Sequence, residues 1–126
     1  MPRFDSATGR YPYLSIDDTE YRLYFEEAGT GEIGLLLQHT AGADGRQWRH
    51  IREDDYLGSK FRIISYDLPY HGKSVPPADT EWWKEEYRLE KEFLMQVPFT
   101  LARPLELDRP GYMGSSIGGH LAVDLA

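Results

Sequence analysis

A glycine-rich segment near the carboxyl end of the chain has the sequence Gly114-Ser115-Ser116-Ile117-Gly118-Gly119. It contains the pattern Gly-x-Ser-x-Gly centred on Ser116, between a short apolar stretch and an apolar helical pattern. A sharp strand-to-helix turn of this kind lifts a serine hydroxyl to the carboxyl edge of a sheet. The alternative is an ordinary Gly-Ser-rich turn. The pattern predicts Ser116 as a nucleophile, with the backbone N–H of Ile117 facing any oxyanion formed beside it.

Strand-like and helix-like patterns alternate along the rest of the chain. The apolar run at 33–38 is typical of a strand covered on both faces. Apolar residues recur at every fourth position from Leu89 to Leu101, which indicates one face of a helix, and Pro98 inside it predicts a kink or an early end. The order of elements indicates an α/β fold, with a mostly parallel sheet and flanking helices. Strands are expected at 13–16, 21–26, 33–38, 61–66 and 111–113, and helices at 46–53, between 81 and 104, and at 117–126.

Composition narrows the class of protein. The chain has 126 residues, 40% of them hydrophobic, which is enough for one domain with a core. The absence of cysteine excludes a disulfide-stapled module, a zinc ribbon and a thiol nucleophile. A formal charge of −7 disfavours nucleic acid as a partner. No apolar run approaches the ~20 residues of a membrane helix, and the start does not resemble a signal peptide, so we expect a cytoplasmic protein without membrane contact.

Two segments nearly match nucleotide-binding motifs. Residues 29–34 fit Gly-x-Gly-x-x-Gly, but a dinucleotide site needs a helix after the third glycine, and the apolar run there indicates a strand. Residues 71–74, His-Gly-Lys-Ser, resemble the end of a phosphate-binding loop. Asp67 stands where that loop requires glycine, and the prolines at 76 and 77 disfavour the helix that should follow. We therefore expect no nucleotide cofactor.

Three blocks of sequence resemble the α/β-hydrolase family, in the order that the family has them. Residues 35–42 are similar to a strand of that fold and the oxyanion loop after it. Residues 64–74 contain the family's Asp-x-Pro-x-x-Gly-x-Ser loop, and residues 107–113 lead into the Gly-x-Ser-x-Gly turn. The resemblance spans roughly residues 20 to 126. It implies a partial α/β-hydrolase fold, the amino-terminal part of a single domain, truncated after the helix that follows the turn.

The resemblance also implies roles for individual residues. Ser116 is the nucleophile, and the oxyanion hole consists of the backbone N–H groups of Ile117 and Ala41, with Thr40 as second choice after Ala41. A central serine disfavours the haloalkane dehalogenase and epoxide hydrolase branches, which use aspartate there, and favours esterases, peptidases and carbon–carbon bond hydrolases. The implied substrate is a small acyl compound, without cofactor or metal. The supporting positions are His39, Thr40, Gly114 and Gly118.

The histidine base that a serine nucleophile needs is not evident in this sequence. In this fold an acid and then a histidine follow the serine along the chain. Only His120 and Asp124 follow Ser116, on one helix and at a spacing at which they pair with each other. We therefore expect the catalytic acid and histidine beyond residue 126, and no efficient turnover by this chain alone. The alternative hypothesis is a non-catalytic module of the same fold that binds a small ligand or a partner chain. The oligomeric state is not indicated.

The remaining candidate residues have structural interpretations. His39 and His71 are predicted to brace loops, and His50 to lie on a solvated helix face. No two histidines have the i, i+4 spacing of a zinc-binding helix. Trp82 and Trp83, with Tyr87, would either line a substrate pocket or form an aromatic patch over the core.

Overall fold

The computed structural model describes residues 2–77, 81–84 and 90–125. Within these residues the main sheet has the strand order β1-β4-β6-β5-β7. β5 lies between β6 and β7 and runs parallel to both, while β4 is antiparallel to β6 and β1 to β4. The predicted α/β fold is confirmed, with three parallel strands on one side of the sheet and antiparallel pairing on the other. The strands are β1 (Thr8–Arg10), β4 (Phe25–Ala28), β5 (Ile33–Gln38), β6 (Phe61–Tyr66) and β7 (Gly111–Gly114).

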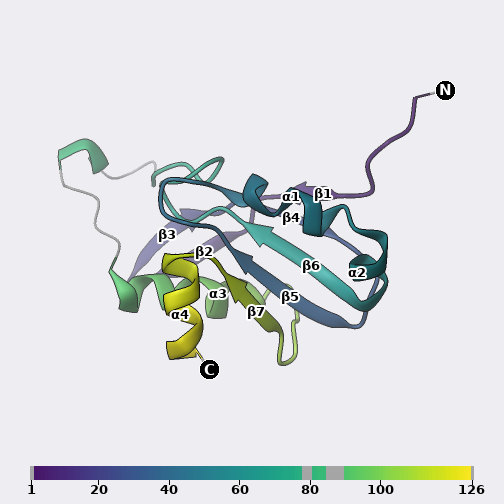
Figure 1. Cartoon of the computed structure of the whole chain (residues 1–126). Coiled ribbons are helices and arrows are strands. Elements are labelled where there is room, and N and C mark those ends of the chain that lie inside the picture. Colours follow the sequence, from purple (N-terminus) through teal and green to yellow (C-terminus); the bar gives the residue numbers. More distant parts are fainter. Residues whose placement is uncertain (1, 78–80, 85–89, 126) are drawn as a thin grey trace.

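Helices cover both faces of this sheet (Figure 1). One face carries the 3₁₀ helix η1 (Gly45–Trp48), α1 (Arg49–Arg52) and α2 (Asp55–Lys60); the other carries α3 (Lys91–Ala102) and α4 (Ile117–Leu125). The predicted helix at 46–53 is thus a 3₁₀ turn followed by one α-helical turn. A further 3₁₀ helix, η2 (Trp82–Lys84), precedes α3. None of the helices in the described ranges is long and apolar enough to cross a membrane.

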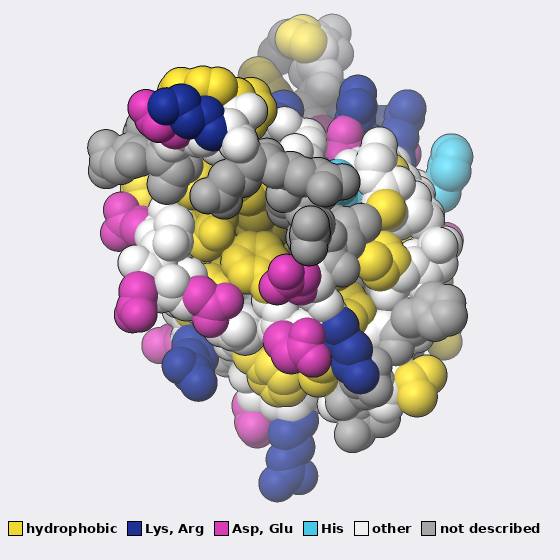
Figure 2. Space-filling view, turned by 90° about the vertical axis from the view of Figure 1, so that its left-hand side faces the viewer, with side chains coloured by type: hydrophobic (Ala, Val, Ile, Leu, Met, Phe, Trp, Pro, Cys, Tyr) yellow, Lys and Arg dark blue, Asp and Glu magenta, His cyan; other side chains and the backbone are white. Residues whose placement is uncertain are grey.

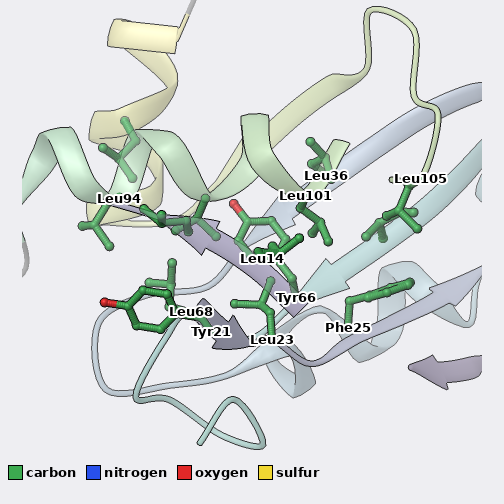
Figure 3. Packing of buried hydrophobic residues seen from close by; sticks show 14 residues of the cluster. Leu14, Tyr21, Leu23, Phe25, Leu36, Tyr66, Leu68, Leu94, Leu101 and Leu105 are labelled. Atoms are coloured by element: carbon green, nitrogen blue, oxygen red, sulfur yellow. The ribbon is translucent and has the colours of Figure 1, made fainter. Parts of the chain in front are cut away.

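Alternation along β5 and β6 builds a core on each side of the sheet. Leu36 and Ile64 belong to the larger cluster, which α3 and α4 cover and which Figure 3 shows from close by. Leu37 and Ile63 point the other way, into a smaller cluster with Trp48 of η1. β5 is therefore covered on both faces, as its continuous apolar sequence predicted.

The prediction of one strand at 21–26 was wrong, because the chain changes sheets within that segment. β2 (Tyr13–Ile16) and β3 (Thr19–Arg22) form a separate antiparallel hairpin, and β4 begins only at Phe25. Between them, the Tyr24 N–H donates to Ser74 Oγ at 2.8 Å and the Tyr24 carbonyl accepts from the Asp67 N–H at 2.9 Å. The alternating pattern continues through both strands, so it gives no sign of the change.

Pro98 does not end α3, which continues to Ala102, so of the two predicted outcomes, a kink or an early end, the early end is excluded. Proline lacks the N–H that would bond the carbonyl four residues earlier, a cost of ~3 kcal/mol inside a helix. Leu94, Val97 and Leu101 are all fully buried against the core, and this packing keeps the helix in place. The beginning of the predicted helical pattern, at Leu89, lies outside the described residues.

Candidate active site

Ser116 lies on the sharp turn between β7 and α4, and its backbone is strained. Its φ is +54°, in the left-handed region that residues with side chains seldom adopt. The turn brings Gly114 and Gly118 together so closely that a Cβ on Gly114 would collide with the Gly118 backbone. A Cβ on Gly118 would in turn lie 2.7 Å from Gln38 Cγ. Only glycine fits at these two positions, and the turn leaves Ser116 exposed to solvent.

Pairing of β5 with β7 brings the loop after β5 to the same edge as Ser116. Gln38, the last residue of β5, is paired with Gly114, the last residue of β7. The Ser115 N–H contacts the Gln38 carbonyl at 3.4 Å. Because parallel strands end at a common edge, the loop that contains Thr40 and Ala41 and the turn that contains Ser116 are neighbours.

The backbone N–H groups of this loop and of the turn differ in whether they already donate a hydrogen bond. The Thr40 N–H donates to Gln47 Oε1 at 2.8 Å. No residue of the described chain accepts a hydrogen bond from the Ala41 N–H. Ile117 is the first residue of α4, where an N–H has no acceptor within the helix. Of the three N–H groups of Thr40, Ala41 and Ile117, that of Thr40 is already bonded within the described structure.

His39 connects the loop after β5 to the loop after β6. Its ring is completely buried. Nε2 accepts from the Leu68 N–H at 3.0 Å, which leaves the proton on Nδ1, and Nδ1 donates to the Thr40 carbonyl at 2.7 Å. Burial lowers the pKa of His39, so the ring is neutral near pH 7. Both ring nitrogens are therefore used in holding the two loops together.

Asp67, at the end of β6, holds the same two loops through its carboxylate. One oxygen accepts from the Gly45 N–H at 2.7 Å and the other from the Lys73 N–H at 2.8 Å. Gly72 has a φ of +48°, and a Cβ there would collide with this carboxylate. Sequence reasoning recognised the Asp-x-Pro-x-x-Gly-x-Ser pattern but missed this role. The sequence pattern that could have indicated this role is an acidic residue directly after a buried strand, followed by a glycine five residues later.

Comparisons with known proteins agree with this geometry, although no model of a protein family matches the chain. A 2-hydroxy-6-oxononadienedioate/2-hydroxy-6-oxononatrienedioate hydrolase of Burkholderia vietnamiensis is 32% identical over 124 residues, 97% of this chain and 41% of that relative. A thermophilic esterase from Thermogutta terrifontis superposes with a TM-score of 0.76 at 27% identity, covering 93% of this chain and 40% of that one. An N-acyl homoserine lactonase gives 0.71 at 26% identity, covering 94% and 40%. The chain has the α/β-hydrolase fold.

This α/β-hydrolase chain spans about two fifths of the length of the curated relatives that it matches. That share agrees with the expectation of the amino-terminal part of such a domain. The matched part contains the turn with Ser116 and the loop with Ala41. The side chains of His120 and Asp124 lie outside the described part of the structure.

The other histidines of the α/β-hydrolase chain lie in two places. His71 is half-buried, its Nδ1 is 3.0 Å from the Pro69 carbonyl oxygen, and its ring centre is 5.1 Å from that of His39. His50 is exposed on α1. Among the described residues, no group of three histidine, aspartate or glutamate side chains is placed to hold a metal ion.

Aromatic residues and a cavity lie elsewhere in the α/β-hydrolase chain. Trp82 and Trp83 contact each other edge to face and are 49% and 64% exposed, so they do not cover the core. Tyr87 is outside the described residues. A cavity of about 400 Å³ lies between the loop that begins η1 and the loop after β6, and no predicted site residue lines it. Its lining includes Tyr24, Glu26, Arg46, Asp67 and Lys73.

Proposed function

We propose that this chain carries the nucleophile of a serine hydrolase that acts on a carboxylic ester or a related acyl substrate. The carrying observation is the strained backbone of Ser116, with φ at +54° on a turn that the contact between Gly114 and Gly118 keeps tight. A costly conformation persists only where the surrounding structure maintains it, and such residues cluster at active sites.

In the proposed reaction, Ser116 Oγ attacks the carbonyl carbon of the substrate. The new bond joins Oγ to that carbon, and the carbonyl oxygen takes the negative charge of a tetrahedral intermediate. The N–H groups of Ile117 and Ala41 are the proposed donors to this oxygen. Breaking the bond to the leaving group gives an acyl-serine, and water then releases the acid. His39 and Asp67 contribute by holding the loop that carries Ala41.

The base that takes the serine proton is the missing part of the mechanism. His39 is unsuited to the role, because its nitrogens are bonded to Leu68 and Thr40 and it is buried. We propose that the acid and the histidine belong to the part of the parent protein after residue 126. The 126-residue chain by itself should then show no efficient turnover, since an unassisted serine hydroxyl is a weak nucleophile.

The substrate class rests on what the related proteins have in common. The names of the relatives describe a hydrolase of 2-hydroxy-6-oxo dienedioates, an esterase and a lactonase. An ester, a lactone and a 6-oxo compound each contain a carbonyl carbon that a nucleophile can attack. Figure 2 faces the edge at which the parallel strands end and shows hydrophobic side chains in a central hollow, bordered by acidic ones. An acyl group with an apolar portion suits such a surface better than a polyanion does.

A fluorophosphonate probe tests the proposal, because it reacts with an activated serine. The full-length parent should be labelled, labelling should disappear in Ser116→Ala, and it should remain in Ser115→Ala, the matched neighbour on the same turn. Labelling that survives Ser116→Ala, or a parent that does not react, would overturn the assignment. In a second arm, the 126-residue chain should hydrolyse a p-nitrophenyl ester no faster than buffer. An ordinary enzymatic rate that is lost in Ser116→Ala would contradict the missing base.

A further inference from the structure

Gly118, at the start of α4, is bonded on both of its backbone groups to residues that precede the turn. Its N–H donates to the Ser115 carbonyl at 3.0 Å, and its carbonyl accepts from the Tyr112 hydroxyl, also at 3.0 Å. Both partners lie before Ser116 along the chain, whereas Gly118 lies after it. Two hydrogen bonds therefore close the turn that carries Ser116, one from the backbone and one from a side chain of β7.

The first turn of α4 has little conformational stability of its own. Gly118 and Gly119 are consecutive, and glycine is less favourable than alanine in a helix because its backbone loses more freedom on folding. Position 118 nevertheless requires glycine, since a Cβ there would lie 2.7 Å from Gln38 Cγ. The close packing of the turn thus weakens the start of the helix, and a bond from a neighbouring strand compensates for this weakness.

The ring of Tyr112 and its hydroxyl have separate roles. The ring packs against the larger core cluster, which also contains Leu36, the register partner of Tyr112 on β5. Burial raises the pKa of Tyr112 to about 12, so the hydroxyl keeps its proton and can donate near pH 7. The Gly118 carbonyl lies within α4, where an N–H four residues later is its regular partner. The Tyr112 bond is therefore an addition to the helix pattern and fixes the place of the helix relative to β7.

We propose that Tyr112 is a positioning residue for the nucleophile, and that its hydroxyl fixes Ser116 Oγ and the Ile117 N–H relative to each other. Ser116 and Ile117 lie between the two ends of the bond, Tyr112 and Gly118. In the proposed reaction, Oγ attacks the carbonyl carbon whose oxygen the Ile117 N–H binds, so both groups must keep their places in the transition state. Misplacement of a reacting group by about 1 Å can cost about 100-fold in rate. This inference rests on the proposed hydrolase function.

Tyr112→Phe in the full-length parent tests the proposal, because it removes the hydroxyl and keeps the ring. With a p-nitrophenyl ester, kcat and kcat/KM should fall together by about tenfold or more, while KM stays within about twofold. This pattern is expected because the hydroxyl acts on the geometry of the transition state and not on substrate binding. A loss that lies wholly in KM would overturn the proposal.

Tyr24→Phe is the matched control. It also removes a hydroxyl that donates a hydrogen bond, in this case to Glu26 on β4 at 2.7 Å, and β6 and β5 separate β4 from β7. Its kcat and KM should stay at the values of the unmodified parent. A decrease in kcat that is no larger in Tyr112→Phe than in Tyr24→Phe would show that the hydroxyl of Tyr112 has no particular effect on the nucleophile.

Ser116→Ala separates this inference from the hydrolase proposal. If Ser116→Ala abolishes turnover, the hydrolase assignment stands, and an unchanged kcat in Tyr112→Phe overturns the positioning role alone. If turnover survives Ser116→Ala, the hydrolase assignment fails, and the positioning role fails with it.

Hydrogen exchange in the 126-residue chain tests the turn without any substrate. The Gly118 amide should exchange at least about fivefold faster in Tyr112→Phe than in the unmodified chain, while the amides of β5 keep their rates. Equal rates at Gly118 would overturn the proposal. A variant that fails to fold, or that loses protection equally in β5, would show that the hydroxyl serves the fold as a whole, which also overturns it.

Discussion

Ser116 has a strained backbone, and it is also the residue whose Oγ is proposed to form the bond to the substrate. A residue with a side chain at φ +54° costs on the order of 1–3 kcal/mol, which the rest of the fold has to offset. The offset comes from β7 and α4 on either side and from the close approach of Gly114 to Gly118. The turn therefore depends on the absence of a side chain at Gly114 and at Gly118 as much as on any contact.

Replacing Gly114 by alanine should disrupt the turn. The new Cβ collides with the Gly118 backbone, which cannot move aside without displacing α4, so the free energy of unfolding should fall by about 2 kcal/mol or more. Urea denaturation measures the loss. Gly111→Ala on the same strand is the control, because the nearest atom to its Cβ would be the end of the Leu35 side chain, at 3.3 Å. Equal losses in the two variants would show that the contact with Gly118 does not matter.

The sequence predicted the strained turn better than the loop facing it. The Gly-x-Ser-x-Gly pattern is local, so its spacing alone indicates a tight turn centred on Ser116. The choice between Ala41 and Thr40 depends on Gln47, whose side chain occupies the Thr40 N–H from seven residues away. The bonds from Asp67 to Gly45 and Lys73 likewise join separate segments. A single sequence carries no direct sign of such contacts.

At the level of elements, β5 and β6 were predicted with the boundaries that the structure has. Both are largely apolar runs between turn-forming or polar residues, so the ends of both strands are visible in the sequence. β3 and β4 were predicted as one strand, because an alternating apolar pattern indicates a strand but not the sheet to which it belongs. α2 was missed, since its six residues are too few for a helical repeat to be visible.

The missed helix α2 depends on its amino-terminal cap, which gives a test. Asp54 accepts from the Leu57 N–H at 2.8 Å, so Asp54→Ala should lower the free energy of unfolding by about 1 kcal/mol. Thermal and urea denaturation both report this change. Asp55→Asn, one residue further on, keeps the cap and should have an effect of no more than about 0.5 kcal/mol. A silent Asp54→Ala would indicate that solvent replaces the cap at no cost.

At the level of the whole molecule, the hairpin β2–β3 and the main sheet share one core. Leu14 and Ile16 of β2 and Tyr21 of β3 belong to the cluster that contains Leu36 of β5. The hairpin therefore reaches the main sheet through side-chain packing rather than through backbone pairing. We expect both sheets to unfold together.

Leu14→Ala tests this coupling. Leu14 is 4% exposed, and truncating a buried leucine costs ~2–5 kcal/mol, so the variant should destabilise the whole chain and not only the hairpin. Trp48 lies in the other core cluster, across the sheet, and reports on it by fluorescence once Trp82 and Trp83 are replaced by phenylalanine. The Trp48 transition and the circular dichroism transition should shift together. Separate midpoints would mean that the hairpin unfolds by itself.

The position of β5 between β6 and β7 also affects the order of events during folding. Its partner β6 begins at Phe61, but its other partner, β7, starts only at Gly111, late in the chain. Pairing over such a long sequence separation is slow, because a large loop must close before any contact compensates for its lost entropy. On the ribosome, β5 and β6 can pair while β7 is still unsynthesised. The turn that carries Ser116 therefore forms after the loop it faces already has its strands.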